Sequence, residues 1–510
     1  MALARTVTVA FEGATATIVD VEANVGPGLP GTYIVGLADK SVAESRDRIK
    51  LATQNSGLAW PKTKIIVSLS PAALKKSGSH FDLAMVLSIL FASDHDAYAE
   101  TILTTTMFLG EASLNGRIRP VAGVIPAILA AKKAGFTRVV IPAENAAEAA
   151  LCEDIDIFCV ESLAQVVRCV TGDEEWEPID RGEVDPPINH KQLPDMRDVA
   201  GQPEARRAAE IAAAGKHNFL MIGPPGSGKS MLAARMPGIL PELTPDEKLE
   251  ATAIHSVAGK AFNGPIMSPP YVAPHHSVTR AALIGGGSGN PVPGAVSLAH
   301  RGVLFLDEVS EIPAAILDSL RTPLEQGYVR LIRSRRDVYF PARFQLIMAA
   351  NPCQCGAEEP SACRCSANAR ARYLNNVSGP LRDRLDMIVC THARGAVIRS
   401  DVQESTAMIR DRVIEARGRA GHRWARAGRP TLSNGEVDGA WLRREYPADE
   451  EAMEYLAVYL AKGAISQRGV DRTLKVAWTI ADLAGAEVPD IDHVAQALEL
   501  HDYGSWEVAA

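Results

Sequence analysis

The chain has 510 residues, 47% of them hydrophobic and 22% charged, and its formal net charge is −8. This length indicates about three domains, and the composition is that of a soluble globular protein. The longest apolar run, Ala84–Ala92, is far shorter than the ~20 residues that cross a bilayer, so no membrane partner is expected. Because the N-terminus also lacks the basic start and apolar block of a signal peptide, we expect a cytoplasmic protein with reduced cysteines.

Residues 1–170 alternate between strand and helix patterns. Strands are predicted at 6–11, 64–69 and 138–142. Helices are predicted at 41–57 and 124–135. Residues 171–193 are acidic, contain prolines and show no periodicity, so we interpret them as a linker.

Residues 194–393 again alternate between strand and helix, and they contain the chemical motifs. From about residue 400 the pattern becomes helical, because apolar residues recur at helix spacing. The predicted helices lie at 400–420, 450–463, 472–485 and 491–501. We therefore expect a second α/β region followed by a helical one.

The strongest motif is "NFLMIGPPGSGKS" at 218–230, where an apolar strand runs into a glycine-rich loop and then a helix. The glycines allow backbone N–H groups to surround phosphate oxygens, and the helix N-terminus adds positive potential. We expect Lys229 to reach the terminal phosphates of ATP and Ser230 to ligate Mg²⁺. The loop consists of Gly223, Pro224, Pro225, Gly226, Ser227, Gly228, Lys229 and Ser230.

Two further strands end in residues suited to ATP hydrolysis. The stretch "GVLFLDEV" places Asp307 and Glu308 after a buried strand, Asp307 to hold Mg²⁺ and Glu308 to act as general base on the attacking water. The stretch "QLIMAANP" places Asn351 after another apolar strand, where it would orient the same water. The alternative for Asn351 is a simple Asn-Pro turn.

Four cysteines follow this asparagine in "NPCQCGAEEPSACRCS", with the spacing C-x-C-x7-C-x-C. Four thiolates can form a tetrahedral zinc site. We favour structural zinc, although unligated loop cysteines and a redox use are alternatives. The candidate ligands are Cys353, Cys355, Cys363 and Cys365.

Two long stretches, "DVAGQPEARRAAEIAAAGKHNFLMIGPPGSGKS" and "PYVAPHHSVTRAALIGGGSGNPVPGAVSLAHRGVLFLDE", resemble AAA+ ATPases of the magnesium-chelatase type. More narrowly, nearly the whole chain resembles the ComM/YifB family. The resemblance implies a Lon-protease-like (ribosomal S5 domain 2-like) α+β domain at 1–170. It further implies a AAA+ P-loop α/β core at 194–393 and a helical lid at 394–510, with 171–193 as the linker.

The resemblance also implies site residues that complete the ATPase between neighbouring subunits of a ring. In "SGPLRDRLDMIV", Arg384 matches the arginine finger, with Arg382 as the second choice. In "AISQRGVDRTLKVAWTIADL", Arg468 best matches the sensor arginine, with Arg472 as the second choice. The segment 198–202 resembles the one that packs beside adenine.

The stretch "VRLIRSRRDVYF" at 329–340 alternates on both sides of a tip that carries Arg333, Arg335 and Arg336. In this branch of ATPases a hairpin at this position points into the central pore. Six copies would then form a basic collar that grips DNA phosphates without reading bases. A solvated surface hairpin is the alternative. A second basic segment, 410–429, has seven arginines against two acids and either contacts DNA or packs on the ring.

The N-terminal stretch "GEASLNGRIRPVAGVIPAILAAKKAGFTRVVIPAEN" carries the Lon-like resemblance. A Lon-type site needs a serine nucleophile and a lysine base. Here His80 occupies the serine position, with Ser77 and Ser79 out of register, and the lysine falls at Ile125 or Ala127. We therefore expect the shape of the protease without its chemistry.

The resemblance as a whole implies a hexameric, ATP-driven motor on single-stranded or branched DNA. Its implied role is branch migration during homologous recombination and the integration of transforming DNA, with a recombinase as a candidate partner. One alternative is a chelatase-type motor that powers metal insertion into a porphyrin. Another is a protein-remodelling chaperone, although such pores usually present an aromatic residue where this hairpin offers arginines.

Overall fold

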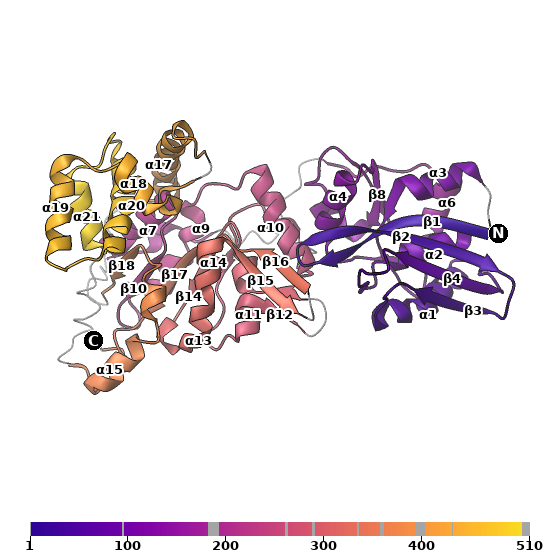
Figure 1. The fold of residues 1–510 in the computed structure, drawn as a ribbon, viewed down its shortest axis with the longest axis horizontal. Coiled ribbons are helices and arrows are strands. Elements are labelled where there is room, and N and C mark those ends of the chain that lie inside the picture. Colours follow the sequence, from indigo (N-terminus) through magenta and orange to yellow (C-terminus); the bar gives the residue numbers. More distant parts are fainter. Residues whose placement is uncertain are drawn as a thin grey trace.

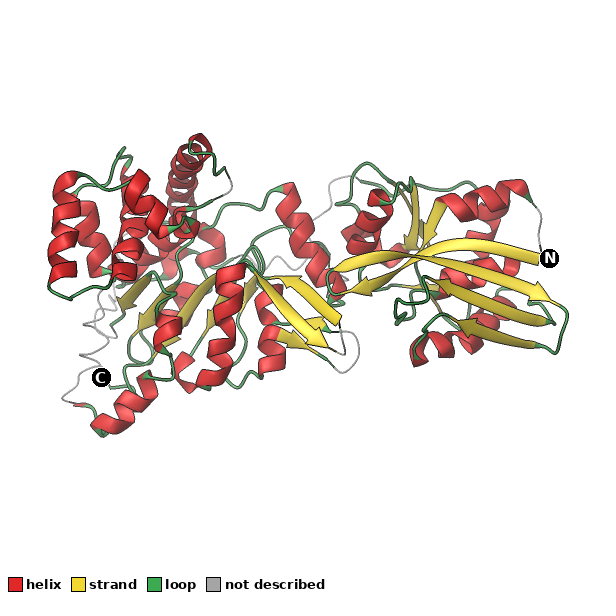
Figure 2. Ribbon diagram, viewed as in Figure 1, coloured by secondary structure: helices red, strands yellow, loops and turns green. Residues whose placement is uncertain are grey.

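The chain forms three bodies that follow one another along the long axis of the molecule (Figure 1). The computed structural model describes residues 2–93, 96–181, 193–260, 264–287, 291–333, 336–357, 362–392, 403–430 and 432–501. Strands are prominent in the N-terminal and central bodies, and helices alone build the far end (Figure 2). The predicted mixed α/β fold with a helical C-terminal region is confirmed. Within the described ranges, no helix combines the length and apolarity needed to cross a membrane.

A seven-stranded sheet forms the N-terminal body, in the order β3-β4-β2-β1-β5-β8-β9. Its strands are β1 (Ala2–Glu12), β2 (Thr15–Gly26), β3 (Gly31–Val35), β4 (Lys64–Ser70), β5 (Thr106–Phe108), β8 (Arg138–Pro142) and β9 (Asp156–Val160). β1 and β2 are paired without interruption from Ala2–Val25 to Glu12–Thr15. The three predicted strands are confirmed as parts of β1, β4 and β8.

Helices cover this sheet and contribute many of the buried residues of its core. They are α1 (Lys40–Asn55), α2 (Asp82–Phe91), α3 (Ala97–Thr105), α4 (Val124–Lys133) and α6 (Leu163–Thr171). α1 begins at Lys40 because the Asp39 carboxylate accepts a hydrogen bond from the Val42 backbone N–H. α2 is buried on nearly all sides, as its continuous apolar run predicts. The two helices predicted here are confirmed.

The central body is built on a parallel sheet with the strand order β11-β14-β17-β10-β18. Its strands are β10 (Phe219–Ile222), β11 (Tyr271–Val272), β14 (Val303–Leu306), β17 (Gln345–Ala350) and β18 (Met387–Cys390). β10, β14 and β17 are buried at every position, which explains their continuous apolar sequences. Because all five run parallel, their carboxyl ends meet at one edge, where α/β sheets bind ligands.

The C-terminal body is a helical cluster around the completely buried Trp424. Its helices are α17 (Thr406–Arg426), α18 (Gly439–Glu445), α19 (Glu450–Ala461), α20 (Gln467–Ala484) and α21 (Ile491–Glu499). α17 and α20 also pack on α7 (Pro203–Gly215) of the central body. The helices predicted from the apolar spacing are confirmed, although α17 begins later than expected because Ser405 caps it at Thr406.

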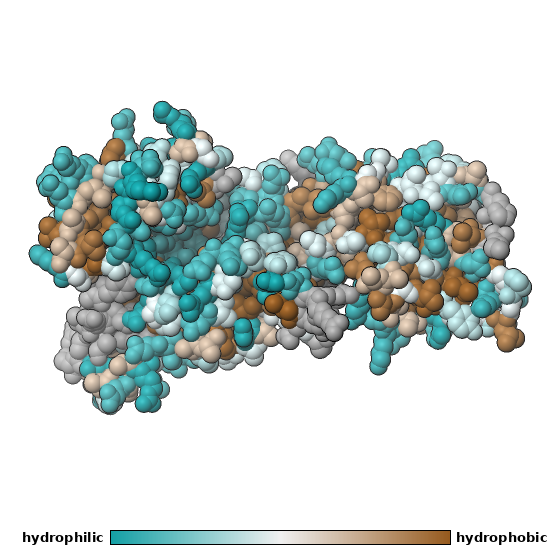
Figure 3. All heavy atoms as spheres, viewed as in Figure 1, coloured by the Kyte–Doolittle hydropathy of each residue, from teal (hydrophilic) through white to brown (hydrophobic). Residues whose placement is uncertain are grey.

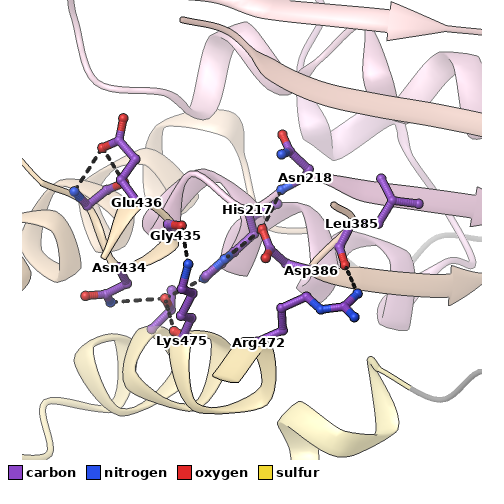
Figure 4. Close-up of polar contacts among 12 residues, drawn as sticks. His217, Asn218, Leu385, Asp386, Asn434, Gly435, Glu436, Arg472 and Lys475 are labelled. Carbon is purple, nitrogen blue, oxygen red and sulfur yellow. Dashed lines mark hydrogen bonds and ion pairs between the residues drawn. The ribbon is translucent and has the colours of Figure 1, made fainter. Parts of the chain in front are cut away.

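A polar network joins this helical body to the central sheet (Figure 4). His217 is completely buried, and its Nδ1 lies 3.4 Å from Asp386 Oδ2. The Asp386 carboxylate also accepts a hydrogen bond of 3.0 Å from the Asn218 backbone N–H. The other ring nitrogen of His217, Nε2, lies 2.7 Å from Thr479 Oγ1 of α20. The joint therefore has a fixed hydrogen-bonding geometry as well as apolar packing.

Among the described residues, contacts in two areas join the N-terminal body to the central body. α10 (Pro245–Val257) packs on α4, and the Gly123 N–H donates to both the backbone and side-chain oxygens of Ser256, each at 3.1 Å. The β1–β2 turn approaches a hairpin of the central body so closely that a Cβ on Gly13 would lie 2.5 Å from Val338 Cγ1. A cavity of about 340 Å³ lies between these contacts, lined from both bodies by residues such as His80, Glu111 and Val292.

The segment interpreted as a linker begins as an ordered extension of the N-terminal body. Gly172 ends α6 in the left-handed conformation. The ring of Trp176 then packs against Phe158, with 5.4 Å between centroids. The Ile179 N–H donates to the Ile157 carbonyl at 2.8 Å. Residues 182–192 lie outside the described residues.

On the face shown in Figure 3, hydrophilic residues cover most of the central and C-terminal bodies, and apolar patches are more frequent over the N-terminal body. The N-terminal edge strand β3 contributes to exposed apolar surface, since Tyr33 is half exposed and the preceding Leu29 is almost fully exposed.

Candidate nucleotide site

The glycine-rich loop lies between β10 and α8 (Lys229–Ala233), in the strand–loop–helix setting that the sequence predicts. Gly226 and Gly228 have φ angles of 80° and 86°, which L-residues rarely adopt. The Lys229 ammonium donates to the carbonyl oxygens of Gly223 at 2.6 Å and Pro224 at 2.9 Å. Burial lowers the pKa of Lys229. The lysine is therefore held inside the loop that would surround the phosphates.

Ser230 and Asp307 meet at the carboxyl edge of the sheet. Ser230 Oγ donates to Asp307 Oδ2 at 2.6 Å, although the two residues are 77 positions apart. The other carboxylate oxygen of Asp307 accepts the Glu308 N–H at 2.9 Å. Hydroxyl and carboxylate oxygens are hard ligands that suit Mg²⁺. The structure thus brings together the two residues predicted to hold this ion.

Asn351 follows β17, the strand between β10 and β14, and therefore lies between the loop and the acidic pair. Its Oδ1 accepts a hydrogen bond of 3.2 Å from Lys229. Tyr373 hydrogen-bonds to the same asparagine, and its pKa is raised mainly by burial and further by Glu311. Asn351 is therefore held beside Lys229, between the glycine-rich loop and the acidic pair.

Glu308 has a residue at its side that the sequence analysis did not identify. Its Oε2 lies 2.6 Å from Nδ1 of His276, which belongs to the segment after β11. The adjacent-strand geometry that brings them together depends on the two-residue strand β11, which is too short to predict from periodicity. The only signal in the sequence was the His275-His276 pair, which lies in the second of the two stretches that resemble AAA+ ATPases.

The two finger candidates lie away from this cluster. Arg384 pairs with the Glu325 carboxylate and donates to the Pro380 carbonyl, and none of its contacts involves the loop, Asp307 or Glu308. Arg382 ends the short helix α16 (Gly379–Arg382). The role of Arg384 as the finger stays a prediction.

The two sensor candidates differ in exposure. Arg472 is 8% exposed, and its guanidinium donates to the Leu385 carbonyl at 2.9 Å. Arg468 is 76% exposed, with one contact of 3.4 Å to Asp383. Arg472 thus fastens α20 to the finger segment, whereas Arg468 keeps a charge that is available to a ligand. The assignment of Arg468 as the sensor, with Arg472 as the second choice, stays a prediction.

The segment 198–202, predicted to flank adenine, packs against the end of β18. The Gln202 side chain donates to the His392 carbonyl at 2.5 Å, and Asp198 pairs with Arg235 at 2.9 Å. Nearby, the hydroxyl groups of Ser227 and Thr391 lie 2.7 Å apart. The segment therefore lies next to the glycine-rich loop.

The predicted arginine hairpin is confirmed as an antiparallel pair, β15 (Tyr328–Arg333) and β16 (Arg336–Pro341). Arg333 lies opposite Arg336 at its end. Arg335 lies outside the described residues, as do the side chains of the other two arginines. The contact between these three arginines and DNA stays a prediction. At the base of the hairpin, Val329 and Phe340 are buried in the core of the central body.

The second basic segment is largely occupied by contacts within the chain. Arg412 pairs with Glu210 and Glu404, Arg417 donates to the Ala213 carbonyl, and Arg423 pairs with Asp482. Of the two interpretations left open for this segment, the structure favours a helix that packs on the core.

The four predicted cysteine ligands converge. Their sulfur atoms all lie within 4.8 Å of one another, with 3.2 Å between Cys353 and Cys355 and 3.4 Å between Cys353 and Cys363. Ligands at the usual zinc–sulfur distance stand about 3.8 Å apart around a tetrahedral zinc ion. All four thiols are unpaired by disulfides. The cluster fits a zinc ion after small adjustments.

The position of the missing Lon nucleophile is apolar. His80 is buried between Phe11 and Phe81, its Nε2 lies 2.9 Å from the Val9 carbonyl, and burial lowers its pKa to about 4. Ile125 and Ala127 are completely buried in α4. A neutral imidazole and two aliphatic side chains provide neither the nucleophile nor the base of a serine–lysine pair.

Comparison with known proteins agrees with this architecture. The family "Magnesium chelatase, subunit ChlI" matches residues 195–397, "Subunit ChlI of Mg-chelatase" matches 21–145, and "Magnesium chelatase, subunit ChlI C-terminal" matches 403–501. An uncharacterized protein of Mycobacterium tuberculosis is 47% identical over 509 residues, which is 99% of this chain and 100% of that protein. Competence protein ComM of Haemophilus influenzae is 38% identical over 505 residues, 98% of this chain and 97% of ComM.

Two other known proteins are similar to this chain, one over nearly its whole length and one over a short segment. The uncharacterized protein YifB of Escherichia coli is 36% identical over 503 residues, 98% of this chain and 97% of YifB. Lon protease 2 of Bacillus subtilis is 35% identical, but over only 100 residues, 19% of this chain and 17% of the protease.

Proposed function

Because this chain belongs to the magnesium-chelatase ChlI-type AAA+ family, with ComM and YifB as nearly full-length relatives, we propose that it is an ATP-driven DNA motor. Its proposed activity is branch migration by a homo-hexamer during homologous recombination, including the integration of transforming DNA. The relationship to a competence protein supports this role. A recombinase that forms the joint to be migrated is the expected protein partner.

The convergence of Lys229, Asp307 and Asn351 at one sheet edge carries the ATPase part of the proposal. Lys229 would contact the β- and γ-phosphates, Glu308 would accept the proton of the attacking water, and Asn351 would hold that water in line. Mg²⁺, held by Ser230 and Asp307, would neutralise charge on the phosphate oxygens. Arg384 of a neighbouring subunit would complete the site.

The hairpin β15–β16 supports DNA as the track. Its base is anchored in the core, whereas its far end carries the arginines in a chain that is acidic overall. A basic collar binds phosphates of any sequence, as a translocating motor requires. ATP turnover would move the collar and the strand it grips.

The test of this function compares ATP turnover and branch migration on a four-way DNA junction with fluorescently labelled arms. Wild type should hydrolyse ATP faster with DNA and should migrate the junction until its arms separate.

Lys229→Ala should lose ATP binding, and Glu308→Gln should keep binding but lose turnover. Replacing Arg333, Arg335 and Arg336 together by alanine should preserve basal turnover and remove DNA stimulation. Wild-type protein that hydrolyses ATP but leaves every junction intact would contradict the motor function.

A second candidate function is a chelatase motor subunit, because the three family matches all carry the ChlI description. In that case ATP turnover would respond to a porphyrin-binding partner rather than to DNA. Insertion of metal into a porphyrin by the chain together with such a partner, without any DNA stimulation, would favour this candidate over the DNA motor.

We also propose that the four-cysteine cluster binds a structural zinc ion. The loop leads directly into α15 (Ala367–Leu374), the helix that carries Tyr373 to Asn351. A metal that braces the loop would therefore fix the position of the water-orienting asparagine.

A further inference from the structure

The cavity between the N-terminal and central bodies is built from both of them. Glu111 of β6 (Glu111–Ala112) and the segment 77–80 line it from the N-terminal body. Val257 of α10 and Val292 of β13 (Val292–Pro293) line it from the central body. Its volume of about 340 Å³ lies within the range of about 300–1,000 Å³ that small-ligand pockets span. A molecule inside it would therefore touch both bodies at once.

Most of the cavity wall is apolar. Phe11, Pro120 and Val121 lie on the side of the N-terminal body, and Val257 and Val292 lie on the side of the central body. A hydrogen bond formed between such walls is stronger than the same bond in water, because the local dielectric is lower. An occupant would therefore need an apolar body, and its few polar atoms would have to match those of the wall.

Glu111 provides the charge of the cavity. Among the described residues that line it, this glutamate is the only acid, and no lysine or arginine is present. Its Oε2 accepts a hydrogen bond from Ser79, which leaves other lone pairs free. The charge of Arg48 acts on Glu111, but the Arg48 guanidinium donates to both oxygens of Asp82, at 2.6 Å and 2.9 Å. The Glu111 carboxylate therefore has no ion-pair partner among the described residues.

His80 provides a second acceptor. The side chain is 5% exposed, and burial lowers its pKa to about 4, so the imidazole is neutral near pH 7. Nε2 lies 2.9 Å from the Val9 carbonyl oxygen, which only accepts, so Nε2 carries the proton and Nδ1 is an acceptor. Within the described part of the chain, no donor is hydrogen-bonded to Nδ1. A Cβ on Gly78 would lie 2.9 Å from that atom, so glycine leaves the nitrogen uncovered.

We propose that this cavity binds a primary ammonium group carried on a small apolar body, with Glu111 and His80 as its acceptors. An ammonium group has three N–H donors and no acceptor, which suits a carboxylate and an unprotonated imidazole nitrogen. An anion would be repelled by Glu111, and a neutral hydroxyl would forgo the charge-assisted bond. The ammonium group belongs either to a free amine or to the amino terminus of a peptide. Once bound, the molecule would hold the N-terminal body on the central body.

The first experiment compares three probes of nearly equal shape on the full chain at pH 7. These are phenethylamine, phenethyl alcohol and hydrocinnamate, which carry an ammonium, a hydroxyl and a carboxylate on the same phenyl body. Ligand-observed saturation-transfer NMR titrations give the Kd of each. Phenethylamine should bind about 10-fold more tightly than the alcohol, the effect expected for one hydrogen bond to a charged group. Hydrocinnamate should give no transfer. Equal binding of the amine and the alcohol, or no binding of the amine, would overturn the inference.

A further arm of this titration distinguishes the two sources of the ammonium group. The dipeptide amide of phenylalanine and alanine presents the same phenyl ring beside a peptide amino terminus. Tighter binding of the dipeptide amide than of phenethylamine would identify an amino terminus as the ligand, and weaker binding would identify a free amine. Both results require that the ammonium is recognised, since acetylation of the dipeptide should abolish its binding. Binding that survives acetylation would contradict the proposal.

Variants on the two sides of the cavity test its location. Glu111→Gln keeps an acceptor for Ser79 but removes the charge, so phenethylamine should bind about 10-fold more weakly. Val292→Trp should block binding by filling the cavity from the central body, and because Val292 is 52% exposed the larger side chain should not prevent folding. Glu100→Gln, which changes an exposed carboxylate of α3 outside the cavity, is the matched control and should bind as wild type. Undiminished amine binding in folded Glu111→Gln protein would refute the site. None of these results depends on ATP or DNA, so the inference stands or falls separately from the proposed function.

Discussion

Arg384 is paired with Glu325, a residue of the helix that leads into the arginine hairpin. Glu325 belongs to α14 (Arg321–Gln326), and β15 begins at Tyr328. The Nε atom of Arg384 is buried without a hydrogen-bond partner in the structure, so its guanidinium is only partly satisfied by this pairing. The finger candidate is therefore in direct contact, within one chain, with the helix that leads into the hairpin.

The first prediction concerns which arginine acts on the neighbouring subunit. Arg384→Ala should lower ATP turnover about 10³-fold, the lower end of the range for removing an arginine finger. ATP binding should be retained, because Arg384 does not contact its own phosphate loop. Arg382→Ala is the matched control and should keep most turnover. A severe loss with Arg382→Ala and none with Arg384→Ala would reverse the assignment.

A second prediction follows from the pairing itself. Glu325→Gln removes the charge that holds Arg384, so the finger should reach its neighbour more readily. We expect turnover to rise about 2- to 5-fold, the effect of one partly exposed ion pair. The rise should disappear when Arg384→Ala is combined with it. Equal rises with and without Arg384 would show that Glu325 acts through the hairpin instead.

The third prediction separates Arg468 from Arg472. Arg468→Ala should lower ATP turnover with little change in Tm, because this exposed side chain makes one long contact. Arg472→Ala should lower Tm, because it leaves the Leu385 carbonyl without its buried donor. Differential scanning calorimetry alongside turnover measurements checks both. A stable Arg472→Ala chain without turnover would make Arg472 the sensor.

The sequence was sufficient to predict the candidate nucleotide site because its residues lie at the ends of buried parallel strands. The continuous apolar runs of β10, β14 and β17 indicated where each strand stops, and Lys229, Asp307 and Asn351 follow those ends. Contacts between elements that become neighbours only in the folded chain could not be predicted from the apolar runs. His276 reaches Glu308 only because the very short β11 lies beside β14.

The arginines of α17 show that the number of charged residues in a segment does not predict a binding surface. In the sequence they form a basic segment that suits DNA, yet Arg412, Arg417 and Arg423 turn toward acceptors on α7 and α20. The number of charges on a helix does not reveal which face is covered. Packing decides it, and packing brought Glu210 and Asp482 to those side chains.

The fourth prediction concerns zinc. Purified full-length protein should contain about one zinc ion per chain, because four clustered thiolates form one tetrahedral site. Replacing the four cluster cysteines by serine should abolish zinc and lower kcat, since Tyr373 and Asn351 lose their brace. Cys159→Ser is the control, because this residue lies in β9 of the N-terminal body. Elemental analysis decides; metal-free protein after growth and purification with added zinc would refute the site.

The last prediction uses the polar joint between the central sheet and the helical body. Burial alone would raise the pKa of Asp386, but the interactions with His217 and Asn218 outweigh it and lower the pKa. A carboxyl whose pKa is lower in the folded chain than in the unfolded chain stabilises the fold above the unfolded value. That contribution is lost as pH falls below about 4 toward the folded pKa.

Asp386→Asn should therefore lower the free energy of unfolding at pH 7 by about 1–3 kcal/mol, the cost of leaving a buried partner unpaired. The variant should also lose less stability than wild type between about pH 4 and pH 2, because it lacks the titrating group. Urea unfolding followed at several pH values measures both effects. Asp20→Asn, which removes a surface pair with Arg5, is the control and should change neither quantity appreciably. If Asp386→Asn kept the full acid dependence of wild type, a carboxyl elsewhere in the chain would be responsible for it, and the joint would be held by packing alone.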